Sequence, residues 1–143
     1  MTTQLYEKLI YKGQDVGMDQ TPLYHYAALG GVFPTFVPQG TTLWRGYIGS
    51  WQIIEDRLYL VGISGTRQDG QETSLNAIFP GFPDRVFAHW FCDCIKLPQG
   101  KRIFSPKIHR SAFVYEADLV LEFEDGVLVK ETLQSNDPED QIP

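Results

Sequence analysis

The sequence predicts a mainly β fold, in the range from all-β to α+β, built as an antiparallel meander of about eight strands that forms a barrel or a sandwich. The composition is 43% hydrophobic and 13% aromatic, which suits the half-buried surfaces of pleated sheets. Short alternating or apolar runs also follow one another along the chain, separated by turn-forming residues. One short helix interrupts this series of strands.

Each element before residue 64 has a local signal. Thr21 and Pro22 are typical of a helix start, and Gly30 supplies a stop. Glu55 and Asp56 join the two strongest apolar and aromatic runs. The expected elements are a hairpin of residues 5–11 and 16–18, a helix near residues 22–29, and a hairpin of residues 42–54 and 57–63.

The C-terminal half predicts two further hairpins. Leu119, Leu121 and Phe123 alternate with polar residues, as expected of a strand with one wet face. Asp125-Gly126 is the best turn in the chain, because a type I′ turn needs positive φ at both positions. The expected elements are a strand at 85–97 turning at 98–100 into a strand at 101–104, and a hairpin of residues 112–124 and 127–133.

One domain is expected over residues 1–134, followed by a disordered acidic tail at 135–143. A chain of 143 residues can bury a core without disulfides or metals. The tail is polar and acidic and contains two prolines, so it has little to bury.

Charge limits the partners. The 18 acidic and 12 basic residues give a formal charge of -6, so the average surface repels phosphate backbones and no nucleic-acid binding is expected. The first residues lack the pattern of a secretory signal, and no run approaches the ~18 apolar residues of a spanning helix. We therefore expect no membrane association and a cytoplasmic location.

Two cysteines, Cys92 and Cys94, stand two residues apart in a predicted strand, which does not favour a disulfide. Alternation places His89 on the opposite strand face, so the three do not predict a zinc site. The cysteines are expected to be small buried apolar residues. Dinucleotide, phosphate-loop and zinc-protease motifs are absent, so we expect no cofactor and no metal.

Several segments carry a resemblance to a group of proteins. The first are Trp44-Arg45-Gly46-Tyr47, Trp51-Gln52-Ile53 and Leu58-Tyr59-Leu60, and the later ones are 88–91, 97–100 and 111–116. From about Leu9 to Val129 the chain resembles a group of small uncharacterised bacterial proteins. The resemblance implies a compact domain, with no fold and no activity attached.

A second, shorter pattern is Gly49-Ser50-Trp51. It is similar to the Gly-x-Trp signature of lipocalin-like barrels. In those barrels the motif opens the first strand, whereas here a long segment and a predicted helix precede it.

Arg45 is the first candidate for ligand binding, because alternation places it on one strand face with Tyr47 and Trp51. A guanidinium among aromatic rings needs a partner, and its planar fork suits a carboxylate or a phosphate. Any bound group is therefore expected to be anionic or aromatic. The alternative is an internal ion pair with Glu116 or another acidic residue.

His89, His109 and Glu116 complete the candidate ligand-binding set. His109, Ser111 and Glu116 also suggest a catalytic triad. However, no glycine-flanked nucleophile elbow surrounds Ser111, and a strand-entry turn explains these residues equally. No catalytic residue is therefore assigned.

The leading hypothesis is a non-catalytic module, of a bacterial accessory type, that binds a small ligand or a protein. Both faces of the predicted hairpin of residues 51–63 are apolar, and one short helix covers little, so the spare face is expected to line a ligand cavity or a homodimer interface. One alternative is a hydrolase or isomerase whose acid-base groups are His89, Asp93, His109 and Glu116. Another is an acidic protein of the immunity or antitoxin kind.

Overall fold

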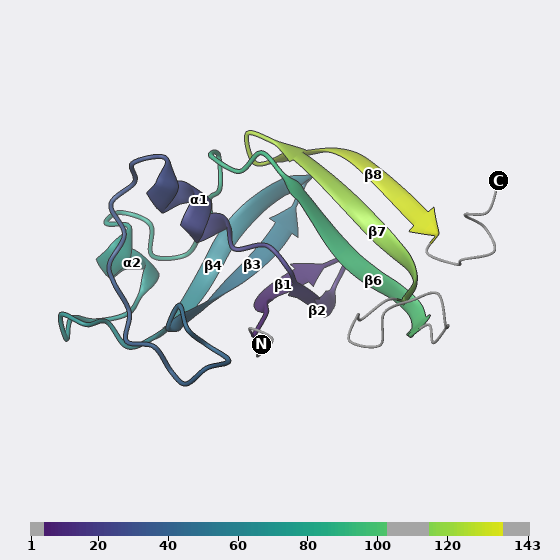
Figure 1. Ribbon diagram of the computed structural model, residues 1–143. Helices are drawn as coiled ribbons and strands as arrows, with labels where there is room; N and C mark the ends of the chain where they lie inside the picture. The colour runs from purple at the N-terminus through teal and green to yellow at the C-terminus, as the bar shows by residue number, and fades with distance from the viewer. Residues whose placement is uncertain (1–4, 103–114, 136–143) are drawn as a thin grey trace.

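The computed structural model describes residues 5–102 and 115–135, and in these ranges the protein is mainly β, with eight strands and two helices (Figure 1). The predicted mainly β class is thus confirmed. The elements are β1 (Glu7–Tyr11), β2 (Gln14–Met18), α1 (Pro22–Ala28), β3 (Tyr47–Ile54), β4 (Arg57–Gly65), α2 (Leu75–Ile78), β5 (Val86–Phe87), β6 (Cys94–Arg102), β7 (Tyr115–Glu124) and β8 (Val127–Ser135).

The strands form one mixed sheet with the order β2-β1-β3-β4-β8-β7-β6, and β5 pairs with β4 beside this path. β1 and β3 run parallel, with Leu9 opposite Trp51. The expected purely antiparallel meander is wrong at this pair. The chain passes through α1 and a long connection before β3 begins, and such a crossover allows a strand to return in the same direction, which a tight hairpin does not.

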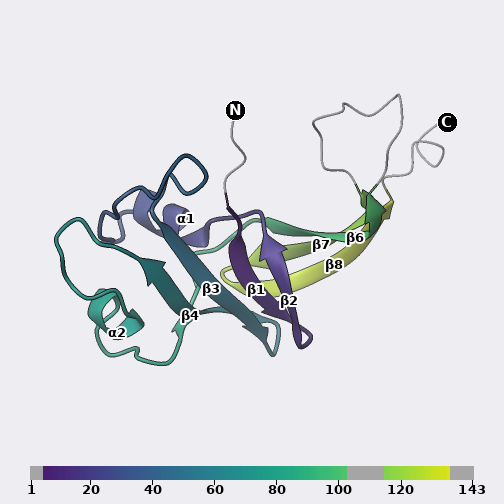
Figure 2. The same ribbon diagram turned by 90° about the horizontal axis from the view of Figure 1, so that it is seen from below.

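The barrel expected as one option is not formed. Among the described residues no ladder joins the end strands β2 and β6, although the N–H of Lys96 donates to the Asp19 carboxylate at 3.4 Å. β4 and β8 are joined by one residue pair, Arg57 and Val127. At this joint the sheet divides into a part with β1–β5 and a three-stranded part with β6–β8, and Figure 2 shows the second part behind the first.

The core lies between these two parts of the sheet. Large side chains from both parts have almost no exposed area, which is what removing apolar surface from water favours. The buried cluster consists of Leu9, Met18, Leu23, Phe36, Tyr47, Trp51, Leu58, Leu60, Leu75, Val86, Ala88, Phe91, Ile95, Leu97, Leu121 and Phe123.

Three two-residue turns close the described hairpins. They are Lys12-Gly13, Glu55-Asp56 and Asp125-Gly126, and all six residues have φ between 50 and 78°. Positive φ at both positions is the signature of type I′ turns, whose twist matches that of the strands. The hairpins predicted around these turns are confirmed, although β3 begins at Tyr47 rather than at residue 42, and residues 112–114 of the predicted strand 112–124 lie outside the described residues.

Helix α1 also confirms its prediction. Thr21 precedes it without a side-chain capping bond, and Pro22 occupies the start of the helix. The helix closes one end of the core, because Trp90 Nε1 donates to the carbonyl of Pro22 at 2.7 Å and the His25 ring meets Phe91 edge to face at 5.5 Å.

The segment 85–102 differs in part from its prediction, and residues 103–104 of the predicted strand 101–104 lie outside the described residues. The expected single strand at 85–97 is interrupted after Phe87. A turn follows there, in which the N–H of Phe91 donates a hydrogen bond to the carbonyl of Ala88 at 3.0 Å. The expected turn at 98–100 is instead a bulge inside β6, with Gly100 at φ 78°. Pairing with β7 carries β6 through this bulge. Helix α2 was not predicted from the sequence. Ser74 is a typical N-cap residue, and its Oγ accepts the N–H of Ala77 at 3.2 Å.

Candidate functional site

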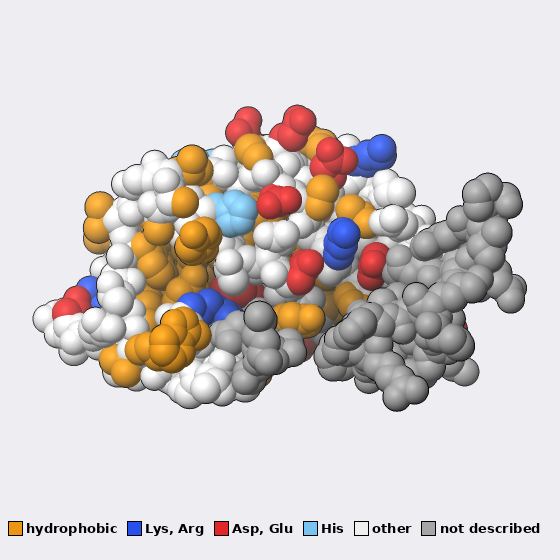
Figure 3. Space-filling model, in the orientation of Figure 1, with side chains coloured by type: hydrophobic (Ala, Val, Ile, Leu, Met, Phe, Trp, Pro, Cys, Tyr) orange, Lys and Arg blue, Asp and Glu red, His pale blue; other side chains and the backbone are white. Residues whose placement is uncertain are grey.

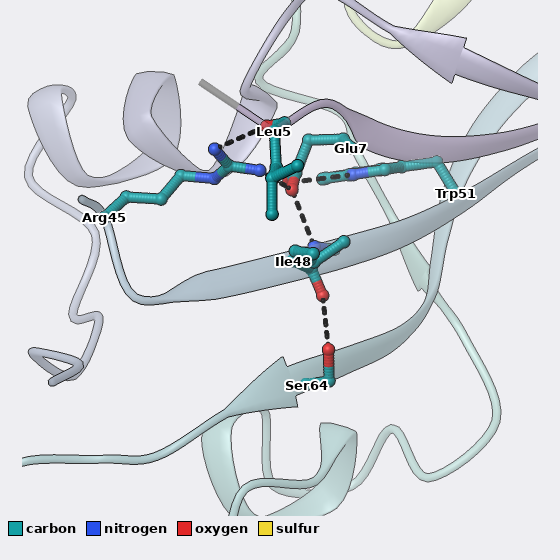
Figure 4. Close-up of polar contacts among 7 residues, drawn as sticks. Leu5, Glu7, Arg45, Ile48, Trp51 and Ser64 are labelled. Carbon is teal, nitrogen blue, oxygen red and sulfur yellow. Dashed lines mark hydrogen bonds and ion pairs between the residues drawn. The ribbon is translucent and has the colours of Figure 1, made fainter. Parts of the chain in front are cut away.

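Arg45 lies in a turn before β3 rather than in a strand, so its predicted position on a strand face is wrong. The turn is closed by a hydrogen bond from the N–H of Gly46 to the carbonyl of Leu43 at 3.1 Å, and Gly46 has φ 81°. From this turn the guanidinium reaches toward β1 (Figure 4). Its Nη1 donates to the carbonyl of Leu5 at 2.9 Å, and its Nη2 donates to Glu7 Oε2 at 2.7 Å.

Glu7 is the buried acid that Arg45 pairs with, and only 1% of it is exposed. Its carboxylate also accepts the N–H of Gly49 at 2.8 Å and Trp51 Nε1 at 3.4 Å. Burial raises the pKa of this carboxyl, and the bonds from Arg45, Gly49 and Trp51 oppose the shift. Glu7 and Arg45 therefore form an internal ion pair that joins β1 to the turn before β3. Of the expected acidic partners of Arg45, the structure shows Glu7 and not Glu116.

The aromatic residues expected beside Arg45 belong to the core. Trp51 is fully buried and Tyr47 is 6% exposed, although the Arg45 Cζ does lie 5.5 Å from the centre of the Tyr47 ring. Burial also raises the pKa of the Tyr47 hydroxyl. The structure thus brings Arg45, Tyr47 and Trp51 together, but inside the protein.

The other candidate residues lie apart from this group. His89 is exposed after β5, and Glu116 is exposed on β7. Glu116 lies near the end of β7 that pairs with Gln99, whereas His89 precedes the opposite end of β6. His109 and Ser111 lie outside the described residues.

The cysteines are less buried than expected. Cys92 is exposed, which corrects the expectation of a buried apolar residue, and its Sγ accepts the N–H of Asp125 at 3.2 Å. The alternation that placed Cys92 and His89 on opposite strand faces does not apply, because no strand forms between Phe87 and Cys94. In the described ranges no group of three or more His, Cys, Asp and Glu side chains is arranged to hold a metal.

Two parallel rows of residues cross the sheet from β1 to β5. The inner row is Leu9, Trp51, Leu60 and Val86, which are paired in this order and buried. The next position on each strand points the other way. This gives a second paired row, and it is half-exposed: Ile10, Gln52, Tyr59 and Phe87.

We call the surface around this second row the outer sheet face. Ile10, Tyr59 and Phe87 are not among the side chains that pack against the core. In Figure 2 strands β1–β4 stand in front, with α1 and the β6–β8 part behind them. Figure 3 shows the molecule in the orientation of Figure 1, turned by 90° from Figure 2, and on this side hydrophobic side chains gather over α1 and charged ones over β6–β8.

Two arginines flank the aromatic end of the outer sheet face. The Arg85 Cζ lies 4.5 Å from the centre of the Tyr59 ring, and the Arg57 Cζ lies 5.8 Å from the centre of the Phe87 ring. The two rings are 5.6 Å apart, and the His89 ring lies 6.5 Å from Phe87. We call Arg57, Tyr59, Arg85, Phe87 and His89 the arginine–aromatic cluster.

Sequence reasoning found one member of this cluster, His89, and missed the other four. A signal was present, because Arg57 and Tyr59 stand two apart, as do Arg85, Phe87 and His89. Residues at this spacing share a face where the strand is regular, as Arg57 and Tyr59 do in β4, whereas Arg85 and His89 lie just outside β5. The spacing of these residues does not indicate that Tyr59 pairs with Phe87, and this pairing joins β4 to β5.

Neither helix in the described part of the chain has the length and apolar character that crossing a bilayer requires. Comparisons with protein-family models, with curated proteins and with solved structures found no significant match.

Proposed function

We propose that the protein is a non-catalytic binding module that docks a partner protein on the outer sheet face. One observation supports this above all. The row Ile10, Gln52, Tyr59 and Phe87 is half-exposed, although the row beside it is buried. Among the described residues no helix or second sheet layer is placed over these side chains, and apolar side chains on such a face gain free energy when a partner covers them.

The placement of the acid-base candidates favours binding over catalysis. His89, Asp93 and Glu116 share no hydrogen bond or ion pair with one another among the described residues. The side chain of Asp93 accepts the N–H of Cys94 beside it at 2.7 Å. The described contacts therefore bring no two of these three groups together, and they give acid-base catalysis at a shared site no support.

Charge favours a different protein over a second copy of this chain. Lys8, Arg57 and Arg85 are exposed on β1, on β4 and just before β5, around the half-exposed row, and one acid, Asp15, is exposed opposite Ile10 on β2. In a symmetric dimer the same patch meets itself, so most of these cations would meet no acidic side chain. A partner with acidic side chains complements them instead.

Site-specific photo-crosslinking tests this proposal. A benzoylphenylalanine replaces Gln52, at the centre of the face, and in a control it replaces Thr132, which is exposed on β8. Both proteins are irradiated in the cells that produce the chain, and the adducts are identified by mass spectrometry. We expect an adduct with one other protein from position 52, none from position 132, and loss of the adduct when Tyr59→Glu is added.

Two results would overturn the proposal. An adduct between two copies of this chain from position 52 would make the face a dimer interface. The absence of any adduct from position 52, in protein that retains its folded circular dichroism, would show that this face docks no partner.

A further inference from the structure

Arg57 and Arg85, the two arginines of the arginine–aromatic cluster, differ from Arg45 and Arg67 in what their guanidiniums contact. Arg45 and Arg67 each donate to a carboxylate and to a carbonyl. Arg57 and Arg85 are exposed, and among the described residues their guanidiniums form no hydrogen bond or ion pair and lie near the Phe87 and Tyr59 rings. Their N–H donors are therefore open to an acceptor from outside.

The rings position these donors. A guanidinium held near an aromatic ring keeps its planar fork, and the ring quadrupole attracts the charge without using the donors on an oxygen. Because Tyr59 and Phe87 are paired across β4 and β5, the two guanidiniums lie over neighbouring rings of one sheet. Such a pair suits bidentate binding of carboxylate or phosphate.

We propose that the arginine–aromatic cluster recognises carboxylate side chains on an acidic segment of the partner protein. The inference rests on the proposed function, since it names the chemistry of the partner at the same face. The acidic residues next in sequence, Asp56 and Asp84, form no ion pair with Arg57 or Arg85. The face around the cluster also carries the aliphatic Ile10 beside Gln52, and an aliphatic side chain suits the apolar groups of a polypeptide better than a sugar-phosphate backbone.

A titration with synthetic polymers tests the inference without knowledge of the natural partner. The probe is a copolymer of glutamate and tyrosine, and a copolymer of lysine and tyrosine is the reference. Binding is followed by the side-chain Nε–Hε signals of the arginines in ¹⁵N-labelled protein. We expect the signals of Arg57 and Arg85 to shift with the acidic copolymer and those of Arg45 and Arg67 to stay in place.

Substitutions then separate the cluster from general charge. Arg57→Gln combined with Arg85→Gln should weaken binding of the acidic copolymer at least tenfold. Lys130→Gln, an exposed position on β8, should change it by less than twofold. The affinity of the parent should also fall as salt rises, because the contacts are ionic.

The outcomes distinguish this inference from the proposed function. Equal binding by the parent and the double variant, or a preference for oligothymidylate over the acidic copolymer, would overturn the inference. If the adduct from position 52 persists in the double variant, the face still docks a partner, and only the role of the two arginines fails. Loss of both the adduct and copolymer binding in the double variant supports both.

Discussion

The guanidinium of Arg45 and the carboxylate of Glu7 lie 2.7 Å apart in the structure, with the Glu7 side chain fully buried. The pair joins the turn before β3 to strand β1, where the parallel contact between the two strands begins. Arg45 also satisfies the carbonyl of Leu5. A buried ion pair of this kind costs much when one partner is altered, because the other charge stays in a low-dielectric site.

Arg45→Lys should therefore destabilise the protein. Lysine keeps the charge but loses the fork that serves Leu5 and Glu7 together, and we expect a loss on the order of 2 kcal/mol in the free energy of unfolding. Urea unfolding measures this loss. Arg85→Lys is the matched control, because Arg85 is exposed, and it should change stability by less than about 0.5 kcal/mol. Equal unfolding midpoints for the two variants would refute the structural role of Arg45.

Glu7 should also give stability a defined pH dependence. Burial raises the pKa of its carboxyl above the ordinary 4.5, so the unfolded chain releases this proton at lower pH than the folded chain. The contribution of Glu7 to stability is then fully present below pH 4.5 and is lost as the pH rises through the folded-state pKa.

Urea unfolding of the parent and of Glu7→Gln at a series of pH values measures this contribution. The difference in stability between them, parent minus variant, should decrease with rising pH above 4.5. The same difference for the exposed Glu131→Gln serves as reference. An increase over this window would mean that the attraction of Arg45 outweighs burial and lowers the pKa.

Gly126→Ala should cost more stability than Gly13→Ala. Both glycines occupy two-residue turns with nearly the same φ, 78° and 76°. A Cβ at Gly13 meets nothing within 4 Å, whereas one at Gly126 would approach the Ala88 carbonyl and come within 2.9 Å of the Phe87 ring. We expect about 1 kcal/mol for Gly13→Ala from backbone strain alone and at least twice that for Gly126→Ala, from thermal unfolding. Equal losses would show that the site relaxes around the new atom.

Asp56→Gly should stabilise the protein. Asp56 has φ 62° in the second position of its turn, where glycine adopts the required conformation at lower cost. The gain should be about 0.5–1 kcal/mol, somewhat offset by the greater freedom of glycine in the unfolded chain. Asp56→Ala should lower the melting temperature, because alanine has neither the conformational freedom of glycine nor the tolerance of aspartate for positive φ. A lower melting temperature for Asp56→Gly would argue against a type I′ turn.

The purified protein should contain no stoichiometric zinc. Cys92 bonds the turn residue Asp125, and the described residues place no third ligand with the two cysteines. Elemental analysis by mass spectrometry measures the metal content after dialysis without chelator. One zinc per chain, lost in Cys92→Ser, would contradict this expectation.

The arginine chemistry expected from the sequence illustrates how much of a candidate site sequence alone can give. The expectation was an arginine near aromatic rings with donors to spare, assigned to Arg45. In the structure Arg45 uses its donors on β1, and the described geometry for such a role is at Arg57 and Arg85. The sequence indicated that an arginine would lie near aromatic rings. It did not indicate that Arg45 would pair with Glu7, which lies 38 positions earlier in the chain.

The sequence by itself determined the local elements: the Glu55-Asp56 and Asp125-Gly126 turns, the place of the turn after Tyr11, helix α1 and the alternation of Leu121 and Phe123 with exposed glutamates. These depend on the dihedral preferences and periodicity of a few adjacent residues. Tertiary structure alone decided the parallel pairing of β1 with β3, the break after Phe87 and the pairing of Tyr59 with Phe87. Such contacts join segments far apart in the chain, and the packing of the whole core selects them.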